Sequence, residues 1–245
     1  MSVRNKHRLC AYCGKTKKAT VDHVPPKLLL EQPFPPNLLN VPACEGCNQS
    51  FKQDDEYTRS VLAVDFRASQ NKAAQFNLAA IRRSLEKPEA RAFADYLTRQ
   101  SRRMNILSST GLPMVEISTD KQRVNNTGLH IMRGLYFIET GKVVPPDASI
   151  RLESKAGLTA DHPDMHTISR VFHVLPDHRH RESGTAFSYM AGFGHEGLVS
   201  VWVMLLYDYF FWVGGIDGRA PADRTFVAPD GSVVTAEDTT DPEQV

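Results

Sequence analysis

The feature that most constrains this chain is its cysteine content: four cysteines in all, arranged as two Cys-x-x-Cys pairs. Cys10 and Cys13 form the first pair, and Cys44 and Cys47 form the second. Each pair can present two thiolates at one point, and four thiolates form the ligand set of a structural, tetrahedral zinc ion. The gap between the pairs exceeds the commonest zinc-ribbon spacing, so we expect a folded segment between them.

The cysteines have an alternative interpretation as two disulfides. No apolar signal segment precedes them, and Met1 leads directly into Val3-Arg4-Asn5-Lys6. This favours a reducing, cytoplasmic compartment, in which disulfides are rare. Gly14 and Gly46 supply the flexible backbone that turns around a metal site need. The sequence therefore predicts structural zinc.

Charge is distributed unevenly along the chain, although the formal net charge is only +1. The first 27 residues hold seven lysines and arginines against one aspartate, whereas the last stretch is acidic. A basic region beside a metal site indicates a polyanionic partner, and the acidic end has the character of a solvated tail. A second basic cluster, Arg82 to Arg103, is equally well explained as a solvated helix face.

Local patterns around the cysteines predict short elements, because proline and glycine are frequent there. Thr20–Val24 predicts a strand that places Val21 and His23 on one face and Asp22 on the other. Gln49–Val64 contains few helix breakers and predicts a helix that starts at the second cysteine pair.

The remainder predicts helices followed by antiparallel strands, and hence an α+β fold. Helices are expected at 71–85, 88–103 and 120–140, the last ending at Gly141. Within that helix, Gly134 is expected to permit a close packing contact. Strands are expected at 150–152, 170–175, 186–191, 199–206 and 209–213, with 192–197 as a hairpin connection and 176–182 as a solvated loop.

A length of 245 residues fits one large domain or two modest ones, and two are expected here. The expected division is a zinc-braced module at 1–65, a helical connector at 66–110, an α+β domain at 111–236 and a disordered acidic tail at 237–245. No run is long enough to cross a bilayer, because the most apolar stretch, Leu198–Trp212, is interrupted by Asp208. Trp202 and Trp212 are therefore expected in the core.

Asp22, His23 and Asn48 are the candidate catalytic group. If the cysteines close on one zinc ion, the strand that carries Asp22 and His23 is joined to the helix that begins near Asn48. Hydrolysis of a phosphodiester needs a base to deprotonate water and a hard cation to stabilise the leaving oxygen. A neutral imidazole suits the first task, and carboxylate and amide oxygens suit magnesium. The alternatives for His23 are a packed core histidine or a zinc ligand that replaces one cysteine.

These residues resemble the HNH endonuclease family, whose ββα-metal motif is often braced by two such cysteine pairs in a treble-clef arrangement. The matching segments are Cys-Ala-Tyr-Cys at 10–13, Val-Asp-His-Val-Pro-Pro-Lys at 21–27, Pro-Asn-Leu-Leu-Asn-Val-Pro at 36–42 and Cys-Glu-Gly-Cys-Asn at 44–48. The resemblance covers about the first sixty residues. The chain is also similar to stand-alone bacterial members of the family, in which the module precedes a C-terminal region of unknown role.

The resemblance implies a role for each matching residue. His23 is the general base, Asp22 and Asn48 bind a catalytic Mg²⁺ or Mn²⁺, and Asn37 fixes the loop that orients His23. Asn40 competes with Asn37 for that place. Asn48 replaces the histidine of the family name, which favours magnesium or manganese over a softer ion. The residues expected to contact nucleic acid are Lys15, Lys17, Lys18, Lys27 and Lys52, of which Lys52 is displaced from the family position.

The implied activity is metal-dependent hydrolysis of double-stranded DNA, with restriction or phage defence as the family's frequent setting. The protein partner is left open between a second copy of the chain and a defence-system protein. Two other functions compete: a non-catalytic zinc module that binds nucleic acid, and an RNA-directed nuclease toxin. A second metal site is the less favoured interpretation of the C-terminal histidines His162, His166, His173, His178 and His180, which match no standard ligand spacing.

Overall fold

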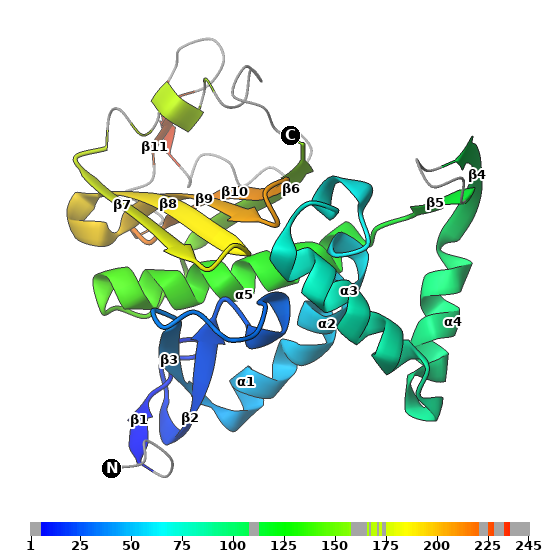
Figure 1. Cartoon of the computed structure of the whole chain (residues 1–245). Coiled ribbons are helices and arrows are strands. Elements are labelled where there is room, and N and C mark those ends of the chain that lie inside the picture. Colours follow the sequence, from blue (N-terminus) through cyan, green and yellow to red (C-terminus); the bar gives the residue numbers. More distant parts are fainter. Residues whose placement is uncertain are drawn as a thin grey trace.

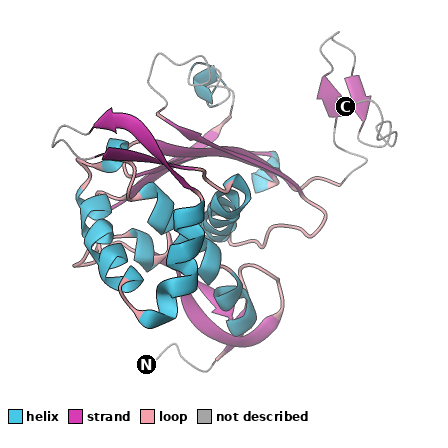
Figure 2. Cartoon of the chain, turned by 90° about the vertical axis from the view of Figure 1, so that its right-hand side faces the viewer, coloured by secondary structure: helices cyan, strands magenta, loops and turns pink. Residues whose placement is uncertain are grey.

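In the computed structural model, helix α5 (Lys121–Thr140) lies between a five-stranded antiparallel sheet and an N-terminal group of short strands and helices (Figure 1). Figure 2 shows the sheet from the side, with most helices gathered against one of its faces. The structure describes residues 6–107, 113–157, 166, 168–170, 172, 175–220, 225–227 and 233–235. The predicted tail at 237–245 lies outside these residues.

The N-terminal sheet has the order β1-β2-β3 and is antiparallel throughout. Its strands are β1 (His7–Leu9), β2 (Thr16–Val24) and β3 (Leu39–Cys44). Helix α1 (Glu45–Ser50) follows β3 directly, as the sequence predicts, and packs against β2 and β3. Asp22 is buried on one face of β2, whereas Val21 and His23 are half-buried on the other, which confirms the predicted alternation.

The helices that follow are α2 (Lys52–Leu62), α3 (Lys72–Leu85) and α4 (Arg91–Arg99), with 3-10 turns at Lys27–Leu29, Phe66–Ala68 and Pro88–Ala90. Asn71 caps α3 by accepting hydrogen bonds from two backbone amides. The helix predicted at 88–103 is too long at its C-terminal end. Ser101–Leu107 forms strand β4, which pairs with β5 (Pro113–Ile117) at the periphery of the molecule (Figure 1).

Helix α5 has both of the predicted ends. The Asp120 side chain accepts hydrogen bonds from two backbone amides at its start, and Gly141 ends it in the left-handed conformation, at φ 69°. Val124, Ile131 and Leu135 are buried along one stripe. The helix packs against α2, β2 and β3 on one side and β6 on the other.

The five-stranded sheet has the order β6-β10-β9-β8-β7. Its strands are β6 (Ser149–Ala156), β7 (Asp177–Ser183), β8 (Phe187–Gly194), β9 (Val199–Leu206) and β10 (Phe210–Asp217), and a further hairpin joins β11 (Thr225–Val227) to β12 (Val233–Thr235). Two sequence predictions are wrong here. The expected loop at 176–182 is edge strand β7, and of the expected strand at 170–175, Arg170 and Phe172 are helical.

One continuous hydrophobic core joins the N-terminal strands and helices to the inner face of the large sheet. Trp202 and Trp212 are fully buried in it, as predicted. The mixed helix and sheet content and the C-terminal antiparallel sheet agree with the predicted α+β class. Among the described residues, no helix combines the length and apolar character needed to span a membrane.

Gly134 lies where α5 packs tightly against β2. A β-carbon added there would lie 2.6 Å from Val24 Cγ2 and 3.2 Å from the Tyr12 hydroxyl. Gly134→Ala is therefore expected to lower the free energy of unfolding by about 1–3 kcal/mol, because overpacking outweighs the gain in helix propensity. Urea unfolding measures this. The matched control is Gly46→Ala in α1, where a β-carbon meets no atom within 4 Å and no loss is expected.

Candidate functional site

The four cysteines converge on one point. Their Sγ atoms all lie within 4.8 Å of one another, and the sulfurs of Cys13 and Cys44 are 3.9 Å apart. None of the four forms a disulfide. Zinc–sulfur bonds of about 2.3 Å in a tetrahedron place the sulfurs about 3.8 Å apart. The cluster therefore has the ligand types and the spacing of a four-thiolate metal site.

Backbone geometry builds this cluster. Gly14, at φ 67°, completes a turn in which its amide donates to the Cys10 carbonyl, so that Cys10 and Cys13 face the same way. The Cys44 amide donates to Cys10 Sγ at 3.3 Å, which ties the two pairs together. Gly46 lies in α1 with no left-handed φ, so the predicted need for a flexible residue holds only at Gly14.

Cys44 lies at the N-terminus of α1. A hydrogen bond from the Cys47 backbone amide lowers the pKa of the Cys44 thiol to about 7, against the opposing effect of burial. Burial raises the pKa of Cys47. A thiolate is the form that binds zinc.

Asp22 lies on the face of β2 that α5 covers, and its side chain is 11% exposed. Its Oδ2 accepts hydrogen bonds from the Tyr12 hydroxyl at 2.6 Å and from His130 Nε2 at 2.8 Å. Burial alone would raise the pKa of Asp22, but the hydrogen bond and the positive charge of His130, together with Tyr12, hold that pKa below its usual value. Asp22 is therefore an anion held in a fixed orientation.

His130, from the middle of α5, completes a buried cluster. Its Nδ1 lies 3.2 Å from a carboxylate oxygen of Asp55, which comes from α2, and its ring stacks on Phe51 with centroids 3.9 Å apart. Burial would lower the pKa of His130, but hydrogen bonds and attraction to Asp22 and Asp55 raise it to about 9. Burial raises the pKa of Asp55 above its usual range. A protonated imidazole thus joins two buried carboxylates.

His23 is half-buried on the opposite face of β2, beside the cross-strand residue Asn40. Burial lowers its pKa, and the positive charge of Lys27 lowers it further, whereas Asp22 opposes both effects. His23 is therefore neutral at pH 7 and retains contact with solvent. Neutral imidazole is the form that can accept a proton.

Asn48 is hydrogen-bonded to β2 at the two residues that precede Asp22. Its Nδ2 donates to Thr20 Oγ1 at 2.8 Å and to the Val21 carbonyl at 3.5 Å. Both bonds use the amide nitrogen, so neither engages the amide oxygen, which is the atom that a cation would bind. The structure thus brings Asn48 against the strand segment that carries the two other predicted residues.

Asn37 lies elsewhere. Its Nδ2 donates to the Glu182 carbonyl at 2.8 Å and so tethers the loop before β3 to edge strand β7. Asn40, the competing residue, is exposed and lies opposite His23 in the β2–β3 register. The structure therefore places Asn40 beside His23, and Asn37 at the contact with the C-terminal sheet.

The five lysines predicted to contact nucleic acid are all exposed. Lys17 and Lys18 lie on β2 where it pairs with β1, and Lys15 precedes them in the hairpin. Lys27 begins the 3-10 turn after β2 and lies over the Phe34 ring, while Lys52 begins α2. The β1–β2 hairpin and the turn after β2 thus both present positive charge.

Sequence reasoning missed Tyr12, Phe51, Asp55 and His130. Tyr12 stands between the first two cysteines, and Asp55 is buried although it lies in the first turn of α2. His130 occupies a buried position of α5 next to Ile131. No local pattern indicated its partner, because Asp22 precedes it by 108 residues.

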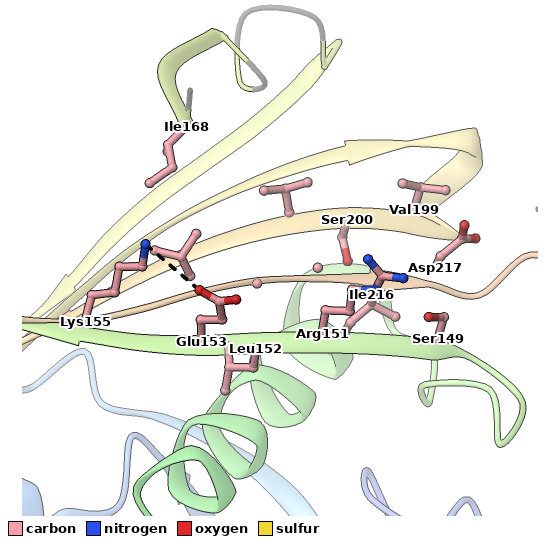
Figure 3. A pocket seen from close by; sticks show the side chains of 14 residues that line it. Ser149, Arg151, Leu152, Glu153, Lys155, Ile168, Val199, Ser200, Ile216 and Asp217 are labelled. Atoms are coloured by element: carbon pink, nitrogen blue, oxygen red, sulfur yellow. Dashed lines mark ion pairs between the residues drawn. The ribbon is translucent and has the colours of Figure 1, made fainter. Parts of the chain in front are cut away.

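A separate cavity of about 710 Å³ lies on the outer face of the large sheet, away from α5 (Figure 3). Val199, Val201 and Val213 form part of its apolar floor. Its charged rim is mixed, because Lys155 Nζ lies 4.0 Å from Glu153 Oε2. None of the predicted site residues lines this cavity.

The cysteine cluster and the β2–α1 unit define the class: an α+β protein with a four-thiol metal-type site beside a strand that carries aspartate and histidine. No family model, curated protein or solved structure matches the chain. Residue chemistry and geometry therefore carry the functional proposal.

Proposed function

We propose that this chain is an HNH-type endonuclease that hydrolyses phosphodiester bonds in double-stranded DNA. The observation that carries the proposal is the attachment of α1 to β2. The cysteine cluster and the Asn48 hydrogen bonds hold the start of the helix against the strand that bears Asp22 and His23. This unit carries a carboxylate on the buried face of β2, an imidazole on the opposite face and an amide at the start of α1.

Zinc is the structural metal in this proposal, with Cys10, Cys13, Cys44 and Cys47 as its ligands. The donor set supports this, because thiolates favour zinc over magnesium. Four protein ligands leave no open coordination position, which is typical of structural rather than catalytic zinc. The role of the cluster is to hold the turn that carries Cys10 and Cys13 against the start of α1.

His23 is the general base. Its lowered pKa keeps the ring neutral at pH 7, and its partial exposure allows a water molecule and a phosphodiester to approach. Lys27, four residues further on, offers a positive charge to the same phosphate backbone. The imidazole takes the proton of the attacking water and is returned to its neutral state by solvent.

Asp22 and Asn48 would hold the catalytic Mg²⁺ or Mn²⁺, through a carboxylate oxygen and the Asn48 amide oxygen. When bound, such an ion stabilises the charge that develops on the phosphate and leaving oxygens. Two protein ligands suffice for magnesium, which keeps several of its waters. The lowered pKa of Asp22 maintains the carboxylate as an anion, as ligation requires.

His130 and Asp55 act in this proposal as positioning residues. His130 holds Asp22 Oδ2 at 2.8 Å and is itself held by Asp55. A carboxylate fixed in this way loses less conformational freedom when it binds a cation. Helix α5 thereby couples the second half of the chain to the proposed catalytic strand.

His23→Ala is expected to abolish magnesium-dependent nicking of supercoiled plasmid, with a loss of at least about 100-fold in rate, because general-base catalysis contributes about 10²–10⁴-fold. Zinc content and DNA affinity should stay close to those of the original protein. The matched control is His7→Ala, an exposed histidine on β1, which should retain full activity. Parallel assays with magnesium, manganese, no added metal and total RNA establish the metal and the substrate. Equal nicking by His23→Ala and the original protein would remove His23 from the proposed mechanism.

A second candidate function is a non-catalytic zinc module that binds nucleic acid. The burial of Asp22, and the occupation of its Oδ2 by Tyr12 and His130, favour this alternative because they restrict access of a cation. The same plasmid assay separates the two. Salt-sensitive DNA binding without cleavage under any divalent ion would support the binding module.

A further inference from the structure

A pocket of about 410 Å³ opens beside the turn that follows β2. It lies between the segment from Lys27 to Phe34, helix α2 and helix α3. Its volume falls within the range of about 300–1,000 Å³ that is common for small-molecule sites. All of the residues that line it are among those that the structure describes.

The charge of the pocket has one sign. Lys27, Arg59 and Arg83 line it, one from each wall, and no lining residue is acidic. The Arg59 side chain is 15% exposed, and its Nε is buried without a hydrogen-bond partner. Its Nη2 lies 3.7 Å from Glu56 Oε1, a long ion pair. The pocket therefore suits an anionic group.

Two aromatic rings accompany these cations. Phe34 lines the pocket with Lys27 Nζ 4.8 Å from its ring centroid, and Phe76, on α3, is 37% exposed. Exposed aromatic rings beside positive charges are the usual platform for bases of single-stranded nucleic acid, because every base has a face that can stack.

Amide groups complete the lining. Gln32 is exposed at the pocket, and Asn77 is 2% exposed and donates to the Tyr207 hydroxyl at 3.2 Å. Amides can donate to and accept from the polar edge of a base. The pocket thus offers cations for the phosphate, aromatic rings for the face of the base and amides for its polar edge.

The pocket is close to the proposed catalytic strand. Lys27 lines it and follows His23 by four residues, with Pro25 and Pro26 between them. A nucleic-acid strand that contacts His23 can therefore reach the pocket within a short length of its sugar–phosphate backbone.

We infer that this pocket binds one unpaired nucleotide of the nucleic acid whose phosphodiester lies at His23. The base stacks against Phe34 and Phe76, and its phosphate lies among Lys27, Arg59 and Arg83. A base inside a duplex is stacked on its neighbours and has to leave the stack to enter such a pocket. The inference rests on the proposed function only in placing the cleaved phosphodiester at His23. Binding of a nucleotide in the pocket does not itself require cleavage.

Fluorescence anisotropy tests whether the pocket binds an unpaired nucleotide. The probes are a labelled single-stranded DNA 16-mer and its blunt duplex, in buffer without added divalent cation. The full-length protein is expected to bind the single strand at least threefold more tightly. Arg83→Glu and Phe76→Ala are each expected to weaken single-strand binding about tenfold. The matched controls are Arg82→Glu and Leu78→Ala, which alter exposed residues of the same helix outside the pocket and should change affinity less than twofold.

Equal weakening by Arg82→Glu and Arg83→Glu would overturn the pocket in favour of general surface charge. Equal affinity for single strand and duplex would overturn it too. Thermal unfolding of each variant separates a folding defect from a binding defect, and Arg83→Lys should restore most of the affinity. If the protein cuts no nucleic acid but these binding differences hold, the proposed nuclease function fails and the pocket stands. If cleavage depends on His23 but the pocket variants bind normally, the proposed pocket fails and the proposed nuclease function stands.

Discussion

Replacing Cys44 with serine is expected to release zinc and to unfold the N-terminal sheet. Cys44 joins β3 to α1, and its amide donates to Cys10 Sγ, so its loss removes a ligand and the link between the two cysteine pairs. Structural zinc contributes an apparent binding free energy of about 10–16 kcal/mol, which is comparable to the whole stability of a typical domain at about 5–15 kcal/mol. Metal analysis measures zinc content, and hydrogen exchange of the β2 amides reports the sheet.

Two controls accompany the Cys44 variant. Ser50→Ala removes an exposed hydroxyl that donates to the Cys47 carbonyl, and it should cost about 0.5 kcal/mol or less and retain zinc. A zinc-selective chelator applied to the unaltered protein should reproduce the Cys44→Ser phenotype, and added zinc, but not magnesium, should reverse it. A zinc-free protein with undiminished protection of β2 would show that the cluster is not a structural metal site.

His130→Ala is expected to lower the free energy of unfolding by about 3–5 kcal/mol. The substitution leaves Asp22 and Asp55 as two buried carboxylates without the cation that joins them, and breaking a buried ion pair costs about this much. It also removes the ring that stacks on Phe51. Urea unfolding measures the loss, and His180→Ala, at an exposed position of β7, is the matched control with an expected change within about 0.5 kcal/mol.

A second variant isolates the charge of this cluster. Asp55→Asn added to His130→Ala removes one of the stranded carboxylates, so the double variant should be more stable than His130→Ala alone. This non-additivity is the signature of residues in contact. A double variant that is less stable by the sum of the two single losses would contradict the proposed charge coupling.

The pH dependence of the His130→Ala effect follows from the raised pKa of His130. The folded-state pKa of about 9 exceeds the ordinary value of about 6.5, so the stability from the protonated ring is fully present below pH 6.5 and is lost as pH rises through 9. The stability difference between the original protein and His130→Ala should therefore shrink between pH 7 and pH 9.5. Asp22 acts in the opposite sense, because its lowered pKa contributes stability that is lost as acid protonates it.

Local chemistry explains which elements the sequence predicted well. Asn71 and Asp120 accept amide hydrogen bonds at helix starts, and Gly141 tolerates the left-handed conformation at a helix end, so these boundaries depend on single residues and their neighbours. The strand Val199–Leu206 was predicted at its observed bounds because its run of apolar and β-branched residues is buried in the sheet.

The failures share a different cause. Strand β7 has the polar sequence Asp-His-Arg-His-Arg-Glu-Ser, typical of a solvated loop, and it is a strand because it pairs with β8 at the sheet edge. The helix predicted to about Arg103 ends at Arg99 because the following residues pair with β5. In both places a partner strand decides the structure, and a partner strand is not visible in the local pattern.

The sequence by itself determined the four-cysteine cluster, the alternation of Asp22 and His23 on β2 and the α+β class, because each depends on spacing along a short stretch of chain. Only the tertiary structure decided what surrounds Asp22. Its partner His130 lies 108 residues further along the chain, on a helix whose Gly134 packs closely against Val24 of β2. Burial and charge pairing arise from contacts between distant segments, and such contacts exist only once the chain has folded.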